Sequence, residues 1–452
     1  MKIIIVGGGK IGTTILESLV SEGHDVVAID SDPKVIGEIS NVYDVMCVCG
    51  NGVDCETLTE AGAENAQLLV AVTGSDEFNM LCCFMAKRMG VKNTIARIRK
   101  PEYNDQSLSF MRQQLDISMA INPDQLAAKE LFHLLQLPAA ESVETFSRRN
   151  FEFVELVLKD TSPLDGMSLM EMRKKYPALY LVGAVQRDGE SFIPDGSFRL
   201  QKGDRIGLTA VSTEIEKLFK MLGLVQKSAK NTMIIGASRV SFYLAQKLLQ
   251  SGNRVTIVEK NSELCHQFAD ALPEAVVICG DGAQEELLLE EGLESMDAFV
   301  TLTGIDEENI LLSYLAQSRG VKKVITKINR EEFTSMAEKL GIDCTVSPRK
   351  LMSNVLTRYA RALENSMGSR IETLYKLMGG RLEALEFKAG SDFPCLGVPL
   401  KDMKLKKNTL IGGIIRGRKA IIPTGTDVIL KEDRVIVLTA GCGMTDLSQI
   451  VG

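Results

Sequence analysis

The residues best suited to chemistry lie within the first twelve positions of the chain. Gly7, Gly9 and Gly12 follow the apolar segment KIIIV and open the amphipathic segment GTTILESLV. Glycines with the spacing G-x-G-x-x-G between a strand and a helix are typical of a loop that binds a pyrophosphate. The first permits a tight turn, the second lets the backbone approach the phosphate, and the third lets helix and strand pack closely. We therefore predict a phosphate-binding loop that also includes Lys10 and Ile11.

An acidic residue stands where the ribose of such a ligand would lie. Asp30 ends the apolar segment DVVAID, 21 residues after Gly9. A carboxylate at this place can accept hydrogen bonds from both ribose hydroxyls, and it repels a 2′-phosphate. This favours NAD(H) or an adenine nucleotide such as ATP or ADP over NADP. A Rossmann-like fold with an empty, vestigial loop is the alternative.

Further polar residues and a glycine follow the later apolar segments. Gly52 either allows close backbone approach near an adenine or only turns the chain. Thr73 and Asp76 have the spacing of a capping box, which predicts a helix cap and is compatible with a place in the ligand crevice. Arg97 and Arg99 are candidates for a phosphate clamp, because guanidinium grips phosphate with two donors. A surface or interface ion pair is an equally good interpretation of the two arginines.

The sequence contains two copies of one unit. Residues 49–79 reappear as residues 279–309, and residues 183–206 match residues 413–436. The spacing between equivalent positions is steady, at 229 from Gly7 to Gly236 and 230 from Thr73 to Thr303. Self-similarity of this kind is the signature of a repeated architecture. Each copy fills about half of the 452 residues.

The second copy has a degraded loop. Of the three glycines only Gly236 remains, while Ser238 and Ser241 replace the second and third. Ser238 places a Cβ where a pyrophosphate would approach, and Ser241 thickens the contact between helix and strand. Glu259 supplies a ribose acid and Thr303 repeats Thr73. Binding here is expected to be weakened rather than excluded, and a purely structural role is the alternative.

The pattern of apolar residues changes character within each copy. Short apolar runs first alternate with amphipathic stretches, which predicts βαβ units and a parallel sheet covered on both faces. From about Phe151 strand patterns separated by turns follow, and Asp188-Gly189 supplies the backbone of a hairpin turn. We therefore predict an α/β protein with two tandem Rossmann-like domains, each followed by a small β-rich module. The expected boundaries are Rossmann-like domains at 1–122 and 230–346, connecting helices at 123–148 and 347–370, and small modules at 149–226 and 371–452, with a linker at 227–231.

The composition is that of an ordinary soluble protein, with 45% apolar and 25% charged residues. No run of about 18 apolar residues predicts a membrane span, and the ten cysteines lack the spacing of a zinc site. Cys47, Cys49, Cys82 and Cys83 lie in apolar runs and are expected to behave as small hydrophobic residues. A net charge of −7 argues against nucleic acid as a partner. We expect a cytoplasmic protein without a metal.

An NAD-dependent oxidoreductase is the main rival from the enzyme class. Hydride transfer requires an acid or base near the nicotinamide, usually within a substantial substrate domain. Here the additional domain is small and repeated, and neither copy has a histidine or a Tyr-x-x-x-Lys motif in a suitable place. We therefore predict that the chain is not an enzyme. A freestanding nucleotide sensor without a membrane partner stays as a second alternative.

The repeat, the loop and the segments AGAENAQLLVAVTGSDEFNM and IARIRKPEY resemble TrkA-like peripheral regulatory subunits of Trk-type potassium uptake systems. The modules resemble regulator-of-potassium-conductance domains. The resemblance implies a tetramer on the cytoplasmic face of the inner membrane that gates a membrane-embedded potassium-translocating subunit through bound NAD(H), ATP or ADP. The residues from Gly7 to Gly12 and Asp30 match the nucleotide loop and ribose acid of the family, and Thr73 and Arg97 match less diagnostic positions. The departures at Ser238 and Ser241 put ligand binding by the second copy in doubt.

Overall fold

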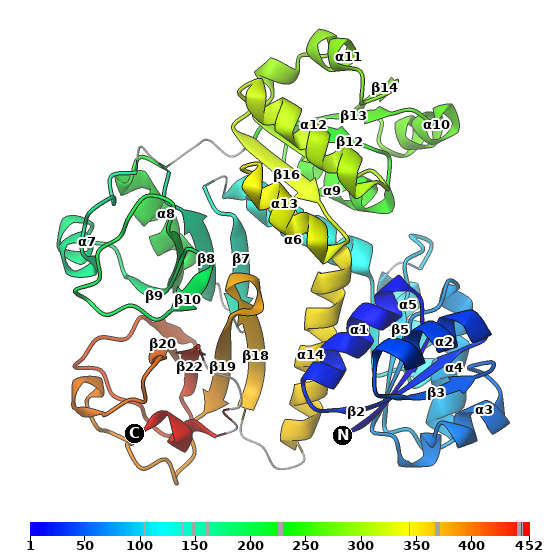
Figure 1. Cartoon of the computed structure of the whole chain (residues 1–452), viewed down its shortest axis with the longest axis horizontal. Helices are drawn as coiled ribbons and strands as arrows, with labels where there is room; N and C mark the ends of the chain where they lie inside the picture. The colour runs from blue at the N-terminus through cyan, green and yellow to red at the C-terminus, as the bar shows by residue number, and fades with distance from the viewer. Residues whose placement is uncertain are drawn as a thin grey trace. The chain divides into compact units, whose positions relative to one another are not determined.

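The predicted fold class is confirmed by the computed structural model, in which two parallel sheets alternate with two antiparallel sheets (Figure 1). The structure describes residues 1–103, 105–137, 139–146, 151–159, 162–224, 229–342, 344–366, 371–440, 444 and 446–452. Each parallel sheet has six strands and each antiparallel sheet has five. The repeat seen in the sequence is therefore a repeat of two successive folds.

The first parallel sheet has the strand order β3-β2-β1-β4-β5-β6. Its strands are β1 Lys2–Val6, β2 Asp25–Asp30, β3 Met46–Cys49, β4 Leu68–Ala71, β5 Asn93–Arg97 and β6 Met119–Ile121. Its helices are α1 Lys10–Ser21, α2 Pro33–Val42, α3 Cys55–Glu60, α4 Asp76–Arg88 and α5 Asp105–Gln114, with a 3-10 turn at Ala63–Asn65. The order reverses between β1 and β4, and ligands of such sheets bind beyond the strand ends at this switch point. β4 is buried along its whole length, as its unbroken apolar sequence requires.

The second parallel sheet repeats this order as β14-β13-β12-β15-β16-β17. Its strands are β12 Asn231–Ile235, β13 Arg254–Glu259, β14 Val276–Cys279, β15 Ala298–Thr301, β16 Lys323–Lys327 and β17 Thr345–Val346. Its helices are α9 Arg239–Gln250, α10 Ser262–Ala271, α11 Glu285–Glu290, α12 Asp306–Ser318 and α13 Glu331–Lys339, with a 3-10 turn at Leu293–Ser295. Both loops of interest therefore join the central strand of a sheet to its first helix.

The two small domains also share one topology. The first contains β7 Ser142–Phe146, β8 Phe151–Val157, β9 Tyr180–Arg187, β10 Glu190–Phe192, β11 Arg205–Val211, α7 Leu169–Lys175 and α8 Ser212–Met221. The second contains β18 Ile371–Leu377, β19 Leu382–Lys388, β20 Thr409–Arg416, β21 Lys419–Ile421, β22 Arg434–Thr439 and 3-10 turns at Met378–Gly380, Leu400–Asp402 and Leu447–Ile450. The predicted hairpin turn is confirmed, since Asp188 and Gly189 have φ values of 51° and 83° between β9 and β10.

The small domains contact each other through their sheets. The hydroxyl of Thr209 on β11 donates to the carbonyl oxygen of Gly412 on β20 at 3.0 Å. The rings of Phe146 and Tyr375 meet edge to face with their centroids 4.8 Å apart. A buried carboxylate, that of Glu155, accepts from the backbone N–H of Met378 at 2.8 Å. These contacts bury the inner faces of two modules that are more than 200 residues apart in the sequence.

The connecting helices are α6 Pro123–Gln136 and α14 Pro348–Ser366. The range 123–148 is thus helical only as far as Gln136, because residues 142–146 form β7 and pair with β8. The first part of α14 belongs to one compact unit with the first Rossmann-like domain, and Ser353 donates to the hydroxyl of Ser18 at 2.7 Å. The linker at 227–231 lies partly outside the described residues.

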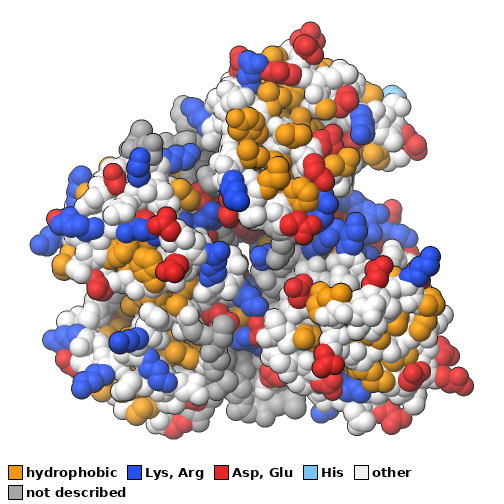
Figure 2. Space-filling model, viewed as in Figure 1, with side chains coloured by type: hydrophobic (Ala, Val, Ile, Leu, Met, Phe, Trp, Pro, Cys, Tyr) orange, Lys and Arg blue, Asp and Glu red, His pale blue; other side chains and the backbone are white. Residues whose placement is uncertain are grey.

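Among the described residues, no helix has both the length and the apolar character that a bilayer span requires. The face of the molecule in Figure 2 mixes acidic and basic side chains, with hydrophobic side chains gathered over α12. Leu311 and Tyr314 on this helix are 65% and 51% exposed, and Leu81 at the equivalent place on α4 is 47% exposed. Each Rossmann-like domain therefore carries exposed apolar side chains on an equivalent helix, α4 in the first domain and α12 in the second.

Candidate nucleotide sites

The first loop has two positions that only glycine can occupy. Gly7 has a φ of 105°, and a Cβ on it would lie 3.0 Å from the backbone nitrogen of Thr73. A Cβ on Gly12 would lie 1.9 Å from the carbonyl oxygen of Gly7, so a side chain there would force α1 away from β1. A Cβ on Gly9, by contrast, would meet no atom within 4 Å. The backbone of the second glycine therefore faces open space, as the approach of a ligand requires.

Helix α1 begins without any side chain on its first N–H groups. Gly9 is the N-cap residue, and no side-chain hydrogen bond caps the helix. Lys10 and Ile11 are the first two helical residues, and Gly12 is the third. The first N–H groups of a helix lack partners within the helix and carry the positive end of its dipole, so they attract anions. The loop thus presents main-chain donors to the open space in front of Gly9.

Asp30 lies beside this loop at the end of β2. One of its carboxylate oxygens accepts from the N–H of Gly8 at 2.7 Å, and the other accepts from the N–H of Asp32 at 2.9 Å. These two bonds hold the carboxylate next to the glycines. Each carboxylate oxygen has capacity for a second hydrogen bond. The structure therefore brings Asp30 and the loop together, as the spacing predicted.

The predicted capping box at Thr73 and Asp76 is wrong. Ser75 is the N-cap residue of α4, and its hydroxyl accepts from the N–H of Phe78 at 3.2 Å. The carboxylate of Asp76 is buried and accepts from the backbone N–H groups of Arg99 and Lys100, both at 2.8 Å. Asp76 therefore ties the start of α4 to the segment after β5. The capping pattern failed here because two candidate acceptors stand within three residues.

Asn79 joins Thr73 to the end of β5, a role that the sequence did not predict. Its side chain accepts from the hydroxyl of Thr73 at 2.7 Å and donates to the carbonyl of Arg97 at 2.9 Å. The guanidinium of Arg97 is buried and donates to the carbonyl of Thr73. Asn309 does the same for Thr303 and Lys327 in the second copy. The available signal was that both copies of the repeated segment end in asparagine.

Gly52 has a packing role in the structure. A Cβ on it would lie 2.3 Å from Cγ1 of Val6, so the loop after β3 could not pack on β1 with any other residue there. Gly282, its counterpart, would place a Cβ 2.7 Å from Cγ2 of Ile235. The glycine is thus required for the fold, whether or not an adenine lies nearby.

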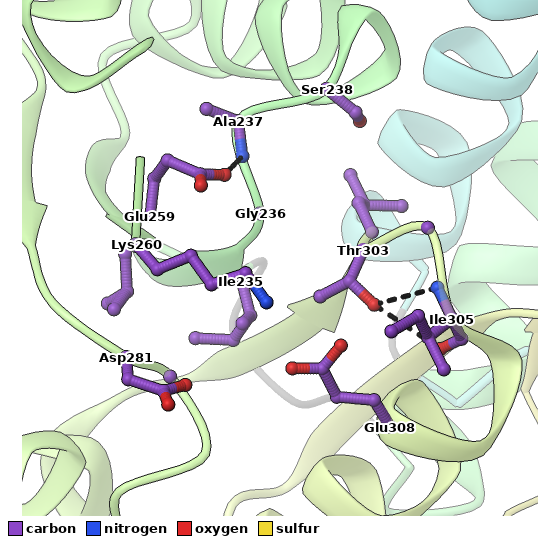
Figure 3. A pocket seen from close by; sticks show the side chains of 14 residues that line it. Ile235, Gly236, Ala237, Ser238, Glu259, Lys260, Asp281, Thr303, Ile305 and Glu308 are labelled. Carbon is purple, nitrogen blue, oxygen red and sulfur yellow. Dashed lines mark hydrogen bonds between the residues drawn. The ribbon is translucent and has the colours of Figure 1, made fainter. Parts of the chain in front are cut away.

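A pocket of about 330 Å³ lies at the strand ends of the second parallel sheet. It lies where the sequence predicts a second nucleotide site, since its lining includes Gly236, Ser238, Glu259 and Thr303. Figure 3 shows the side chains of Lys260, Asp281 and Glu308 around the same space. Glu259 accepts from the N–H of Ala237 at 2.7 Å, as Asp30 does from Gly8 in the first copy.

The second loop caps its own helix. The hydroxyl of Ser238 accepts from the N–H of Ser241 at 3.2 Å, and the hydroxyl of Ser241 accepts from the N–H of Ser238 at 3.2 Å. The hydroxyl of Ser241 also donates to the carbonyl of Gly236 at 2.6 Å. Ser241 is fully buried between strand and helix, as its predicted position implies. The two loops therefore differ in which N–H groups they leave open.

The nine cysteines that the structure describes are free thiols of mixed exposure. Cys82 and Cys83 are buried in the core of the first domain. Burial raises the pKa of the Cys82 thiol to about 12, and it also raises the pKa of the Cys83 thiol. Cys49, which was expected to behave as a small hydrophobic residue, ends an edge strand and is exposed. Among the residues described, no group of three or more His, Cys, Asp or Glu side chains is arranged to hold a metal ion.

Comparison with known proteins identifies the family. The TrkA-N domain family matches residues 3–123 and 232–348, and the TrkA-C domain family matches residues 153–223 and 384–449. The Trk system potassium uptake protein TrkA of Vibrio alginolyticus is 32% identical over 97% of this chain and 95% of its own. A TrkA homolog of Archaeoglobus fulgidus is 31% identical over 97% of both chains. The chain belongs to the TrkA family.

The relatives named above are Trk system potassium uptake proteins, in agreement with the prediction that the chain is not an enzyme. The predicted regulator-of-potassium-conductance fold is also confirmed. The GsuK RCK domain has a TM-score of 0.63 at 16% identity, covering 97% of this chain and 92% of its own. The GsuK channel has a TM-score of 0.64 at 16% identity, covering 97% of this chain and 76% of its own. A further structure with this fold is described as the GsuK channel bound to NAD.

Proposed function

We propose that this TrkA-family chain binds NAD(H) or an adenine nucleotide such as ATP or ADP in the first loop. Through that ligand it regulates a membrane-embedded potassium-translocating subunit from the cytoplasmic face of the inner membrane. The observation that carries the proposal is the loop from Gly7 to Gly12. Its second glycine faces open space, its helix has no side-chain cap, and Asp30 is held beside it. Main-chain donors for phosphates and an acceptor for ribose hydroxyls thus lie at one edge of the sheet.

The proposed control acts by linkage. A ligand shifts a conformational equilibrium only by its difference in affinity for the two states. Coupling free energies of about 1–3 kcal/mol are typical and correspond to about a 5–150-fold change in the equilibrium between the two states. The backbone of Gly7 in the first loop packs against Thr73, which hydrogen bonds join to Asn79 and Arg97. A ligand on the loop would thus lie next to a connected set of polar groups.

We further propose that the chain assembles as a homo-oligomer, with a tetramer expected from the family resemblance. Support comes from the exposed apolar side chains of Leu81 on α4 and of Leu311 and Tyr314 on α12. Exposed apolar side chains that gather on one surface, as those of Leu311 and Tyr314 do on α12, mark interaction sites. Mass measurement of the full chain in solution tests this. A monomer at micromolar concentration would contradict it.

The decisive experiment combines nucleotide binding with potassium uptake. Asp30→Ala should weaken NADH and ADP binding to the purified chain about tenfold or more and should change potassium uptake in cells. Glu259→Ala is the matched control in the second copy, and it should leave binding at the first loop unchanged. If Asp30→Ala abolished nucleotide binding but neither variant changed potassium uptake, the chain would be a freestanding sensor. Turnover of NADH by the purified chain would point instead to an oxidoreductase.

A further inference from the structure

The second pocket is more acidic than its counterpart. Its lining includes the carboxylates of Glu259, Asp281 and Glu308 and a single ammonium group, that of Lys260. At the equivalent positions, the first copy has Asp30, Asn51, Phe78 and Ser31. The second copy therefore has two carboxylates that the first copy lacks. Like charges brought together at the mouth of a pocket repel an anionic ligand, and this repulsion is a common source of specificity.

Two N–H groups of the second loop, those of Ser238 and Ser241, already have partners within the loop. The N–H groups of Ser238 and Ser241 donate to each other's hydroxyls, both at 3.2 Å. The two hydroxyls lie 2.8 Å apart, and that of Ser241 donates onward to the carbonyl of Gly236. This network uses the N–H groups and the hydroxyl protons of both serines within the loop. A phosphate would have to break it to reach these two N–H groups, whereas no side chain caps the first helix.

The pocket does retain acceptors for hydroxyl and amino groups. The carboxylate of Glu259 is positioned by the N–H groups of Ala237 and Asn261, at 2.7 and 2.8 Å, and each of its oxygens can accept once more. Asp281 and Glu308 add further acceptors around the same space (Figure 3). A ligand that fits these groups is rich in donors and has no negative charge. A ribose diol next to an amino-bearing base has this chemistry.

We propose that the second pocket binds an uncharged nucleoside, with adenosine as its simplest probe, and that it rejects the phosphorylated forms. This inference rests on the proposed function, because it assumes that the strand ends of this fold receive a ribosyl ligand. The two copies then bind different ligands. The first loop responds to a phosphorylated nucleotide, and the second pocket responds to the product that remains when the phosphates are gone.

The test uses the full chain with Asp30→Ala, which removes the acid of the first loop. Calorimetry should show that adenosine binds at least about tenfold more tightly than ADP, with AMP between them. Adding Glu259→Ala should abolish the adenosine signal, which locates it in the second pocket. Asp281→Asn combined with Glu308→Gln should reduce the preference for adenosine to less than about threefold. Glu307→Gln is the matched control, since this carboxylate is exposed, binds Arg330 and does not line the pocket.

Three results would overturn the inference: no adenosine binding, equal or tighter binding of ADP with or without Mg²⁺, or a preference that the double variant does not alter. These results concern binding that persists in the Asp30→Ala background. Failure of the proposed function would give a different result, namely that the wild-type chain and Asp30→Ala bind NADH and ADP equally well. Circular dichroism of each variant establishes that it is folded.

Discussion

The hydroxyl of Ser241 donates to the carbonyl of Gly236 at 2.6 Å, across the junction where the first copy brings Gly12 against Gly7. In the first copy, the equivalent carbonyl is that of Gly7, and a Cβ on Gly12 would lie only 1.9 Å from its oxygen. One copy thus closes the junction by a side-chain hydrogen bond and the other by the absence of a side chain. The serine pair of the second copy also occupies the N–H groups of Ser238 and Ser241, whereas no side chain caps the first helix.

Gly12→Ser should destabilise the first Rossmann-like domain, because the new Cβ would overlap the carbonyl of Gly7. Overpacking of this kind costs about 1–3 kcal/mol. Thermal unfolding should show an earlier first transition, and calorimetry should show loss of nucleotide binding. Gly9→Ala is the control, since its Cβ would meet open space. It should keep the unfolding temperature and weaken only binding, and an equal loss of stability in both variants would contradict the packing argument.

Asn79→Ala should destabilise the first domain by about 1–3 kcal/mol, because the half-buried hydroxyl of Thr73 and the buried carbonyl of Arg97 lose their hydrogen-bond partner. Asn309→Ala should do the same to the second domain. Urea unfolding followed by hydrogen exchange assigns each effect to its domain. If either variant loosened both domains equally, Asn79 and Asn309 would not be local clamps.

Stability should fall as the pH rises through the titration of Glu155. Burial raises the pKa of this carboxyl group, while the Met378 N–H and Arg205 act in the opposite direction. A folded-state pKa above the unfolded value, about 4.3, means that the native state holds its proton more tightly. This contribution is complete at pH values below 4.3 and is lost as the pH rises through the folded-state pKa.

Glu155→Gln should therefore flatten the dependence of the unfolding temperature on pH above about 4.3, because glutamine can still accept from Met378 without carrying a charge. Unfolding temperatures of both proteins across this range provide the measurement. A steeper dependence in the variant would show that the ion pair with Arg205, 3.7 Å away, outweighs burial.

The wild-type chain should prefer NAD to NADP by about tenfold or more, because the carboxylate of Asp30 repels a 2′-phosphate. Asp30→Ser removes the charge and should narrow this preference to less than about threefold. Calorimetry with both dinucleotides measures it. Equal affinity in the wild type would indicate that Asp30 serves only to hold Gly8, to which it is bonded at 2.7 Å.

Much of the architecture could be predicted from the sequence, because its signals are local or repeated. Apolar runs such as KIIIV mark strands, the Gly7 spacing marks a strand-to-helix turn, and Asp188-Gly189 marks a hairpin. The steady offset between the copies predicts that both halves share a fold. Loop and acid were placed together because consecutive parallel strands end at one edge of a sheet.

Other relationships depend on which groups meet in space. Ser75, rather than Thr73, caps α4, and Asp76 instead bonds the segment after β5, a choice made by distances that spacing does not encode. The last part of the range 123–148 became β7 because it found β8 as a partner. The pairing of Ser238 with Ser241 likewise turned two apparent defects in a motif into a closed hydrogen-bond network. Sequence determined the residues available at each strand end, and tertiary packing decided which of their hydrogen bonds were already satisfied.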